Sequence, residues 1–288
     1  TRTRALRQNG WKMNQQYKNH QYKISKDAVT KITPWSNYST DNNRNLSALR
    51  ESTMRTPTRW PPSSFKSDTH KSCAIVGNSG RLLSTNYGEL IDSHDYVIRF
   101  NQATTEGYED HVGSKTNARV VNCHVINSLM PLESNQHNIE TFSKFDPQFL
   151  LKIQNETVFF KDIPNATINC LNKLDQIMHD NGCESSFLDQ QWMTDLALQM
   201  GLEAGKTPTC GTVGVGLALG LSFSPIVVRN IIFDKISCFG FSFYADPWSK
   251  IHYYEDVKEY DQSSVHGLDS EKKAMLELEE EGLIKIYR

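Results

Sequence analysis

The sequence predicts an α/β fold, a twisted and mostly parallel sheet flanked by helices. Short continuous apolar runs are typical of strands buried on both faces, and the chain has them at 73–77 (CAIVG), 96–100 (YVIRF) and 118–122 (ARVVN). Stretches compatible with helix separate several such runs, which favours helices packed on a parallel sheet. A small-residue segment, GTVGVGLALG at 211–220, is expected to form a helix that packs closely against its neighbours.

The remaining elements follow from apolar spacing and from glycine stops. A strand is expected at 155–163, and helical spacing over 166–182 and 185–205 stops on Gly182 and Gly205. After the small-residue helix, the sequence predicts an inner strand at 234–243, a helix at 271–281 capped by Asp269 or Ser270, and a last strand at 283–288.

The first 66 residues differ in composition from the rest of the chain. They are dominated by Asn, Gln, Lys, Ser and Thr, and their apolar periodicity is weak. One reading is a stem or partly ordered lead-in, and the other is an ordered extension packed through Trp11, Trp35 and Trp60. Both readings leave 67–288 as a single globular domain.

Composition excludes several classes of protein. The formal net charge of −2 argues against a nucleic-acid partner, which usually meets a basic face. No apolar run approaches the roughly 18 residues of a membrane helix. The six cysteines form no CxxC pair, so zinc-type spacing is absent. Four N-x-S/T sequons, at Asn37, Asn45, Asn155 and Asn165, give weak support for a secretory route.

The turn VGNSG at 76–80 is a candidate ligand site. A glycine-bounded turn after a strand lets backbone N–H groups approach a phosphate or sugar, and Asn78 and Ser79 add polar side chains. Asn101 follows the next strand in the same way. Ligands of open α/β sheets bind at this end of the strands. An ordinary strand–helix connection is the alternative reading of the turn.

A second candidate is the turn TPTCG, which places Thr209 at the start of the small-residue helix. The positive end of a helix dipole, with its free N–H groups, favours an anion. The glycines of GVGLALG at 214–220 resemble a nicotinamide-binding pattern, but no apolar strand precedes them. A nicotinamide-dependent oxidoreductase is therefore disfavoured.

Two histidines, His252 in HYYE and His266 in HGLDSE, lie in a polar region after the last central strand. Histidine is the natural general base near neutral pH, although a lone histidine is more often a surface or core residue. The sequence has no D-x-D and no histidine cluster with metal spacing. We therefore expect no metal site.

Taken together, four segments resemble the motifs of the eukaryotic-type sialyltransferases, glycosyltransferase family 29. Residues 73–122 resemble the large sialylmotif, with its Cys, GNSG, IDSHDYVIRFN and VGSKT. PTCGTVGVGLAL with ISCFGF resembles the small motif, HYYE the third motif, and HGLDSE the very small motif. The four occur in family order.

The resemblance implies a Rossmann-like, nucleotide-binding catalytic domain, a variant of the GT-A type, at 67–288. It implies inverting, metal-independent transfer from a CMP-activated sialic acid donor, with no cofactor, to a terminal sugar hydroxyl of a glycan on a glycoprotein or glycolipid. It also implies a disulfide bond and a Golgi-lumen, type II membrane protein, anchored by a segment that precedes Thr1. The 3-hydroxyl of galactose is the expected acceptor position.

Roles for individual residues also follow from the resemblance. His266 would accept the proton of the attacking hydroxyl, and His252 would stabilise the departing CMP phosphate. Donor binding would involve the polar residues of three turns: Asn78, Ser79, Asn101, Thr209, Cys210 and Gly211.

The chain departs from the family pattern at its cysteines. Phe233 stands near the small-motif position whose cysteine would pair with Cys73, so Cys73 could pair with Cys210 or Cys238, or stay reduced. Cys210 replaces the usual Ser or Thr. These departures leave room for a related nonulosonic acid as donor. The alternative function is a catalytically inactive nucleotide-sugar or glycan-binding relative.

Overall fold

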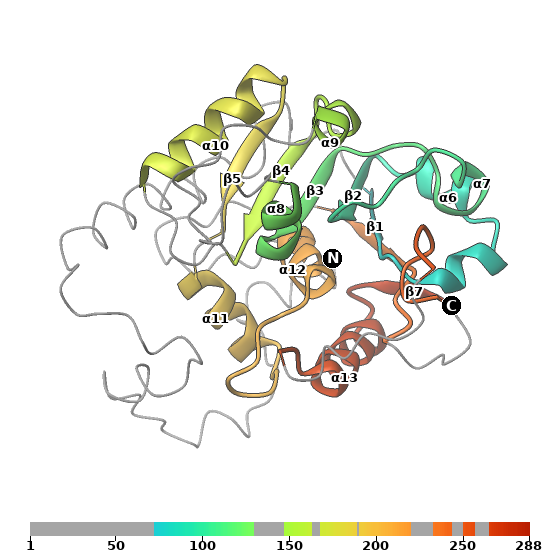
Figure 1. Cartoon of the computed structure of the whole chain (residues 1–288). Helices are drawn as coiled ribbons and strands as arrows, with labels where there is room; N and C mark the ends of the chain where they lie inside the picture. Colours follow the sequence, from blue (N-terminus) through green and yellow to red (C-terminus); the bar gives the residue numbers. More distant parts are fainter. Residues whose placement is uncertain are drawn as a thin grey trace, which may run out of the picture.

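A computed structural model describes seven stretches of the chain (Figure 1): 72–129, 147–162, 168–188, 190–219, 233–243, 250–256 and 265–288. The polar segment 1–66 lies outside the described residues. Its two readings, and the boundary at 66, therefore stay predictions.

The described residues form one sheet in which every pairing is parallel. In spatial order its seven strands are β5 (Glu184–Phe187), β4 (Thr157–Lys161), β3 (Ala118–Asn122), β2 (Tyr96–Phe100), β1 (Ser72–Val76), β6 (Lys235–Phe239) and β7 (Lys285–Tyr287). The predicted parallel α/β fold is confirmed, and the sheet is parallel throughout.

The strand order reverses at β1. From β1 the chain adds strands outward as far as β5, and it then returns to place β6 on the other side of β1. Such a reversal is the topological switch point of a doubly wound sheet. Because the strands are parallel, all of them end at one edge, called here the carboxyl edge. In doubly wound sheets, ligands bind at this edge, close to the switch point.

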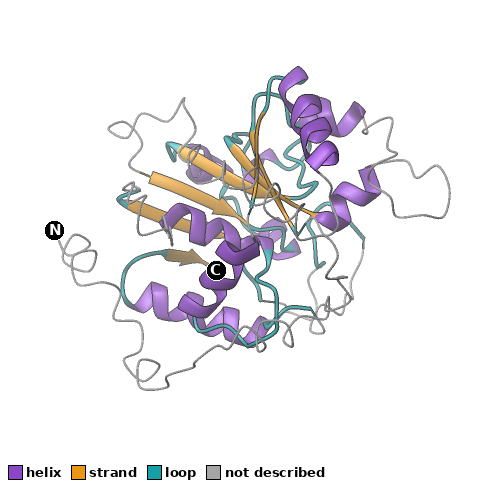
Figure 2. Cartoon of the chain, turned by 90° about the vertical axis from the view of Figure 1, so that its left-hand side faces the viewer, coloured by secondary structure: helices purple, strands orange, loops and turns teal. Residues whose placement is uncertain are grey.

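Helices cover both faces of the sheet (Figure 2). Their bounds are η2 (Gly80–Ser84), α6 (Gly88–Asp92), α7 (Glu109–Val112), α8 (Cys123–Leu129), α9 (Pro147–Lys152), α10 (Ile168–Asp180), α11 (Gln190–Gln199), α12 (Cys210–Leu219) and α13 (Leu268–Glu280). Within the described ranges, none of them is long and apolar enough to cross a membrane.

Strand alternation divides the core between the two faces. Cys73 and Ile75 of β1 belong to the cluster that packs against α11, α12 and α13. Ala74 and Val76 point the other way, toward η2 and α6. The small residues of α12 let it approach closely, since a Cβ on Gly214 would lie 2.7 Å from the Phe100 ring. The expected close packing of this helix is confirmed.

Two expectations about local structure were wrong. The helical spacing over 185–205 contains strand β5 at its start, and helix α11 begins only at Gln190. The short segment ESSF pairs with β4 along its length, and this tertiary pairing overrides the helical pattern. Helix α13 starts at Leu268, with Gly267 as the preceding residue and no side-chain cap. Ser270 instead donates to the Gly267 carbonyl.

The described cysteines are free thiols: Cys73, Cys123, Cys183, Cys210 and Cys238. Cys73 lies opposite Ile236 in the ladder, and Cys238 lies opposite Ile75, so the two thiols are diagonal neighbours on one face. Phe233 is buried and its ring packs 5.8 Å from that of Tyr96. Of the states left open for Cys73, the structure has the unpaired thiol.

A buried histidine joins helix α6 to strand β6. His94 is 2% exposed, its Nδ1 lies 2.8 Å from the Leu90 carbonyl, and its Nε2 lies 2.9 Å from the Ser237 hydroxyl. This arrangement suits a neutral ring that donates through Nδ1 and accepts through Nε2. Burial is the main cause that lowers the pKa of His94.

We predict that His94 makes the fold sensitive to acid. Its folded pKa is depressed, so the unfolded chain binds the proton first, and stability falls as the pH drops below about 6.5. The slope from one such group reaches at most about 1.4 kcal/mol per pH unit. Urea unfolding on both sides of this pH should show a shallower dependence in His94→Asn. His179→Asn, at an exposed position, is the control. Equal slopes in all three proteins would contradict the prediction.

Candidate functional site

Polar side chains mark the carboxyl ends of four neighbouring strands. Asn78 follows β1, Asn101 follows β2, and Asn122 and Lys161 are the last residues of β3 and β4. Asn122 and Lys161 lie opposite each other in the ladder, and the Asn122 N–H donates to Asn101 Oδ1 over 3.1 Å. The carboxyl edge therefore carries a continuous polar row that starts at the switch point.

The turn after β1 requires glycine at two places because other backbone segments approach it closely. Gly77 N–H donates to the Phe239 carbonyl over 2.7 Å, and a Cβ on Gly77 would lie 2.5 Å from the Gly240 oxygen. Gly80 N–H donates to the Lys250 carbonyl over 2.8 Å, and its Cβ would lie 2.5 Å from that oxygen. The turn is thus wedged between the end of β6 and the segment 250–256.

Asn78 joins this turn to the segment 250–256. Its carbonyl accepts from the Tyr253 N–H over 2.8 Å, and its Nδ2 donates to the Tyr254 hydroxyl over 3.2 Å. Asn78 Oδ1 is buried and has no partner among the described residues. A buried acceptor without a donor is costly, so this oxygen is suited to a ligand N–H or O–H. Ser79, in contrast, is engaged as the cap of η2, accepting from the Arg81 N–H.

Asn101 and Cys210 lie side by side. Asn101 has a left-handed backbone, with φ at 52°, and its Oδ1 is 3.8 Å from the Cys210 sulfur. Burial raises the pKa of Cys210 to about 11, so its side chain is a thiol that donates to this oxygen. Gly211 follows in the first turn of α12, packed under the Phe241 ring.

Thr209 precedes α12, but its polar groups are not free. Its N–H and its hydroxyl both donate to the carboxylate of Glu271, over 2.9 and 2.6 Å, and the Thr212 hydroxyl donates to the same carboxylate. Glu271 is 3% exposed and comes from the first turn of α13. A buried carboxylate therefore ties the starts of two helices together. The sequence predicted free N–H groups at this helix start, and the N–H of Thr209 is not one of them, because Glu271 accepts from it.

His252 lies in the segment that docks on the Asn78 turn. Its Nδ1 is 2.7 Å from Glu255 Oε2, and its ring stacks on that of Tyr254, with centroids 5.3 Å apart. The Glu255 carboxylate orients the ring through this contact. Nε2 has no partner among the described residues.

His266 lies just before α13. Its Nδ1 is 2.6 Å from the Thr207 carbonyl, and the Thr207 N–H in turn donates to the carbonyl of Val265. Because a carbonyl can only accept, Nδ1 carries the hydrogen and Nε2 keeps its lone pair. Burial is the main cause that lowers the pKa of His266, which keeps the ring neutral. The arrangement suits a general base.

All eight predicted site residues lie in turns or helix starts at the carboxyl edge. Direct contacts join Asn101 to Cys210, and the Tyr253–Tyr254 pair links Asn78 to the segment of His252. The roles that the resemblance gives these eight residues stay predictions.

Sequence reasoning missed three residues of this edge. Asn122 ends the apolar run ARVVN as Asn101 ends YVIRFN, so that signal was available. Glu271 was noted only as a member of the HGLDSE segment, and no role was predicted for it. Lys161 is 1% exposed and pairs with Asp162, and nothing in the sequence distinguishes it from a surface lysine. Among the described residues, no three His, Cys, Asp or Glu side chains gather as metal ligands.

Comparison with known protein families matches residues 15–283 to glycosyltransferase family 29 (sialyltransferase). Among individual relatives, the chain is 28% identical over 221 residues to CMP-N-acetylneuraminate-beta-galactosamide-alpha-2,3-sialyltransferase 1 of Gallus gallus, covering 75% of this chain and 58% of that protein. It is 49% identical over 71 residues to a beta-1,6-galactosyltransferase of Arabidopsis thaliana, covering 25% of this chain and 18% of that protein. The chain thus spans less than two thirds of these relatives.

Solved structures with a similar fold include a mammalian sialyltransferase, with a TM-score of 0.54 at 21% identity over 91% of this chain and 85% of that one. A structure of a mammalian sialyltransferase with Gal-beta-1-3GalNAc-ortho-nitrophenol gives a TM-score of 0.50 at 22% identity, covering 86% and 81%. At these identities the likeness establishes the shared fold.

We predict that Glu271 contributes to stability through its three hydrogen bonds. Hydrogen bonds to a charged group are each worth about 1.5–3 kcal/mol, so Glu271→Ala should lower the free energy of unfolding by at least about 2 kcal/mol. Denaturant unfolding measures this, with Glu277→Ala on the same helix as the control at a half-exposed position. A loss no larger than that of the control would contradict the prediction.

Proposed function

The chain belongs to glycosyltransferase family 29, the sialyltransferases, and from this membership we propose that it transfers a sialic acid, or a related nonulosonic acid, from a CMP-activated donor to a glycan hydroxyl. The 3-hydroxyl of a terminal galactose is the proposed acceptor position. On the same basis we propose a Golgi-lumen location for the full-length protein, with a membrane anchor N-terminal to Thr1.

The observation that carries the proposal is the state of His266. Its Nδ1 hydrogen is bound by the Thr207 carbonyl, and its Nε2 has no partner among the described residues. Beyond the effect of burial, the ring lies near enough to Lys161, at the end of β4, for the lysine charge to lower its pKa. In the proposed reaction the acceptor oxygen attacks the anomeric carbon and its proton passes to Nε2. The bond from that carbon to the phosphate oxygen breaks, and CMP leaves with the electron pair. Attack from the face opposite CMP inverts the anomeric centre.

His252 is suited to the leaving group. Glu255 orients its ring through Nδ1 and leaves Nε2–H to donate to a phosphate oxygen. CMP is a monophosphate, so one positively charged donor with neutral hydrogen bonds can offset the charge that develops on it. We therefore propose that the transfer needs no metal and no cofactor. Asn78 Oδ1, buried without a donor, supports nucleotide binding at the neighbouring turn.

We predict that His266→Ala lowers the rate of acceptor-dependent CMP release by about 10²–10⁴-fold, the usual contribution of a positioned general base. The measurement is CMP release from CMP-sialic acid with and without a galactosyl acceptor, in the presence of EDTA. CMP binding measured by calorimetry should be unchanged in the variant. Loss of activity on addition of EDTA would contradict metal independence, and an active His266→Ala would remove this base from the mechanism.

We predict that the acid limb of kcat/KM lies below about pH 6.5, the usual histidine pKa, because burial lowers the pKa of His266. The Glu271 charge acts in the opposite direction and raises this pKa. Glu271→Gln should therefore move the acid limb to still lower pH. A pH–rate profile of the two proteins measures the shift, and an unmoved or higher limb in the variant would contradict it.

A second candidate is galactosyl transfer, which the 49% identity over 71 residues with the Arabidopsis thaliana beta-1,6-galactosyltransferase favours. The same assay with UDP-galactose separates the two, since it releases UDP in place of CMP. Tight CMP binding with no acceptor-dependent turnover of any nonulosonic donor would instead support a binding protein without chemistry.

A further inference from the structure

The backbone of Asn101 is held in a conformation that non-glycine residues seldom adopt. Its φ of 52° lies in the left-handed region, where the surrounding structure has to hold it. The bend that follows is closed by the Ala103 N–H, which donates to the Phe100 carbonyl over 3.1 Å. On the side chain, Oδ1 accepts from the Asn122 N–H and the Cys210 thiol. Nδ2 has no partner among the described residues, so it remains for a ligand.

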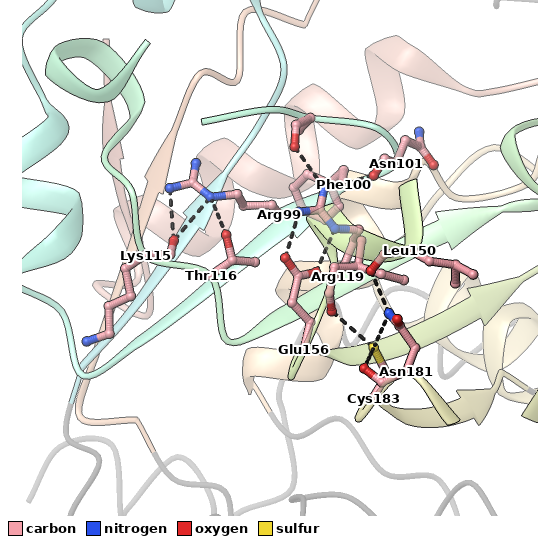
Figure 3. A network of polar contacts seen from close by, with 12 residues as sticks. Arg99, Phe100, Asn101, Lys115, Thr116, Arg119, Leu150, Glu156, Asn181 and Cys183 are labelled. Atoms are coloured by element: carbon pink, nitrogen blue, oxygen red, sulfur yellow. Dashed lines mark hydrogen bonds and ion pairs between the residues drawn. The ribbon is translucent and has the colours of Figure 1, made fainter. Parts of the chain in front are cut away.

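Arg119 holds this bend through hydrogen bonds from its guanidinium group. Its Nη1 donates to two carbonyls, those of Asn101 and Ala103, both over 2.9 Å (Figure 3). Arg119 is 1% exposed and is the second residue of β3. One guanidinium nitrogen thus fixes the carbonyls on both sides of residue 102.

Glu156 in turn fixes Arg119. The two side chains form a bidentate pair, Nε to Oε2 over 2.7 Å and Nη2 to Oε1 over 2.8 Å. Glu156 is 4% exposed, and its N–H donates to the Ile153 carbonyl, which also accepts from the Cys183 thiol. The bond network therefore runs from the chain before β4, through Arg119, to the backbone of Asn101.

A neighbouring arginine provides a contrast. Arg99 is also fully buried, but it donates to the Val112 and Lys115 carbonyls and to the Thr116 hydroxyl. Among the described residues, it makes no hydrogen bond to the Asn101 bend and has no bidentate carboxylate partner. Arg99 holds the loop that precedes β3, whereas Arg119 holds the bend at the carboxyl edge.

We propose that Arg119 and Glu156 are positioning residues for the nucleotide: they set the left-handed bend at Asn101 and so aim its Nδ2 at the donor. The proposal rests on the proposed nucleotide-binding function of this edge. A buried ion pair is weak evidence for stability, because apolar residues of similar volume often replace such a pair without loss. What apolar residues cannot replace here is the pair of hydrogen bonds to the two carbonyls.

The test is a double variant, Arg119→Met with Glu156→Leu, which removes both charges together and keeps apolar volume. Calorimetry measures the Kd of CMP, and steady-state kinetics measure the KM of donor and acceptor. We expect the CMP Kd and the donor KM to rise about tenfold, the effect of losing one well-placed hydrogen bond, while the acceptor KM stays within about twofold. Arg119→Lys keeps the positive charge beside Glu156 but loses the bidentate geometry of the guanidinium group, so it should also weaken CMP binding. This variant provides the test if the double variant unfolds.

Two controls distinguish positioning from a general loss of structure. Arg99→Met disturbs a buried arginine away from the bend and should leave the CMP Kd within about twofold at comparable loss of stability. Adding Asn101→Ala to the double variant should cause little further loss, because residues that act through one another are not additive. Additive losses, or a CMP Kd in the double variant equal to that of the wild type, would overturn the inference.

Failure of the proposed function has a different outcome. If the wild-type chain binds UDP and not CMP, only the proposed donor is contradicted. The same variants are then compared by their Kd for UDP. A wild-type chain that binds neither nucleotide overturns both the function and the inference. If the wild type binds CMP and the double variant binds it equally well, only the inference is overturned.

Discussion

The structure depends on the close approach of three backbone segments at the switch point. The turn after β1 contacts the end of β6 through Gly77 and the segment 250–256 through Gly80, in each case at a distance that leaves no room for a Cβ. Those contacts bring the segment of His252 against Asn78. Because the sheet is parallel, the same edge also receives Asn101, Asn122 and the starts of α12 and α13. The same backbone contacts therefore define both this edge of the fold and the positions of the candidate site residues.

Most strands of the sheet, and several residues at its carboxyl edge, could be predicted from the sequence for a physical reason. Strands buried on both faces are apolar throughout, so the runs that became β1, β2, β3, β4 and β6 stood out, and the residues that end them marked the edge. The polar strand β5 was missed because its four residues carry no such signal. Arg119 and Glu156 were missed because a charged residue in a strand, or next to one, looks solvent-facing until its partner, 37 positions away, is known.

The two histidines of the candidate site are held by different partners. The Thr207 carbonyl and a desolvated setting leave His266 neutral, whereas the Glu255 carboxylate orients the ring of His252. Under the proposed function, His266 would accept a proton and His252 would contact the departing phosphate. Glu271 connects this site to the scaffold, since it binds the turn of Thr209 and lies in the first turn of the helix that follows His266.

The position of β6 has a consequence for biosynthesis. β1 is central in the finished sheet, but its neighbour on one side is encoded about 160 residues later. At a synthesis rate of about 5–20 residues per second, β1 waits roughly 8–32 s with one row of backbone groups unpaired. During that interval the nascent chain contains a partial sheet with β1 as an exposed edge strand, which can pair with a wrong segment or with another chain. The carboxyl edge beside β1 is completed only after β6 is made, and a chain released before β6 would lack the backbone that packs against the turn of Gly77.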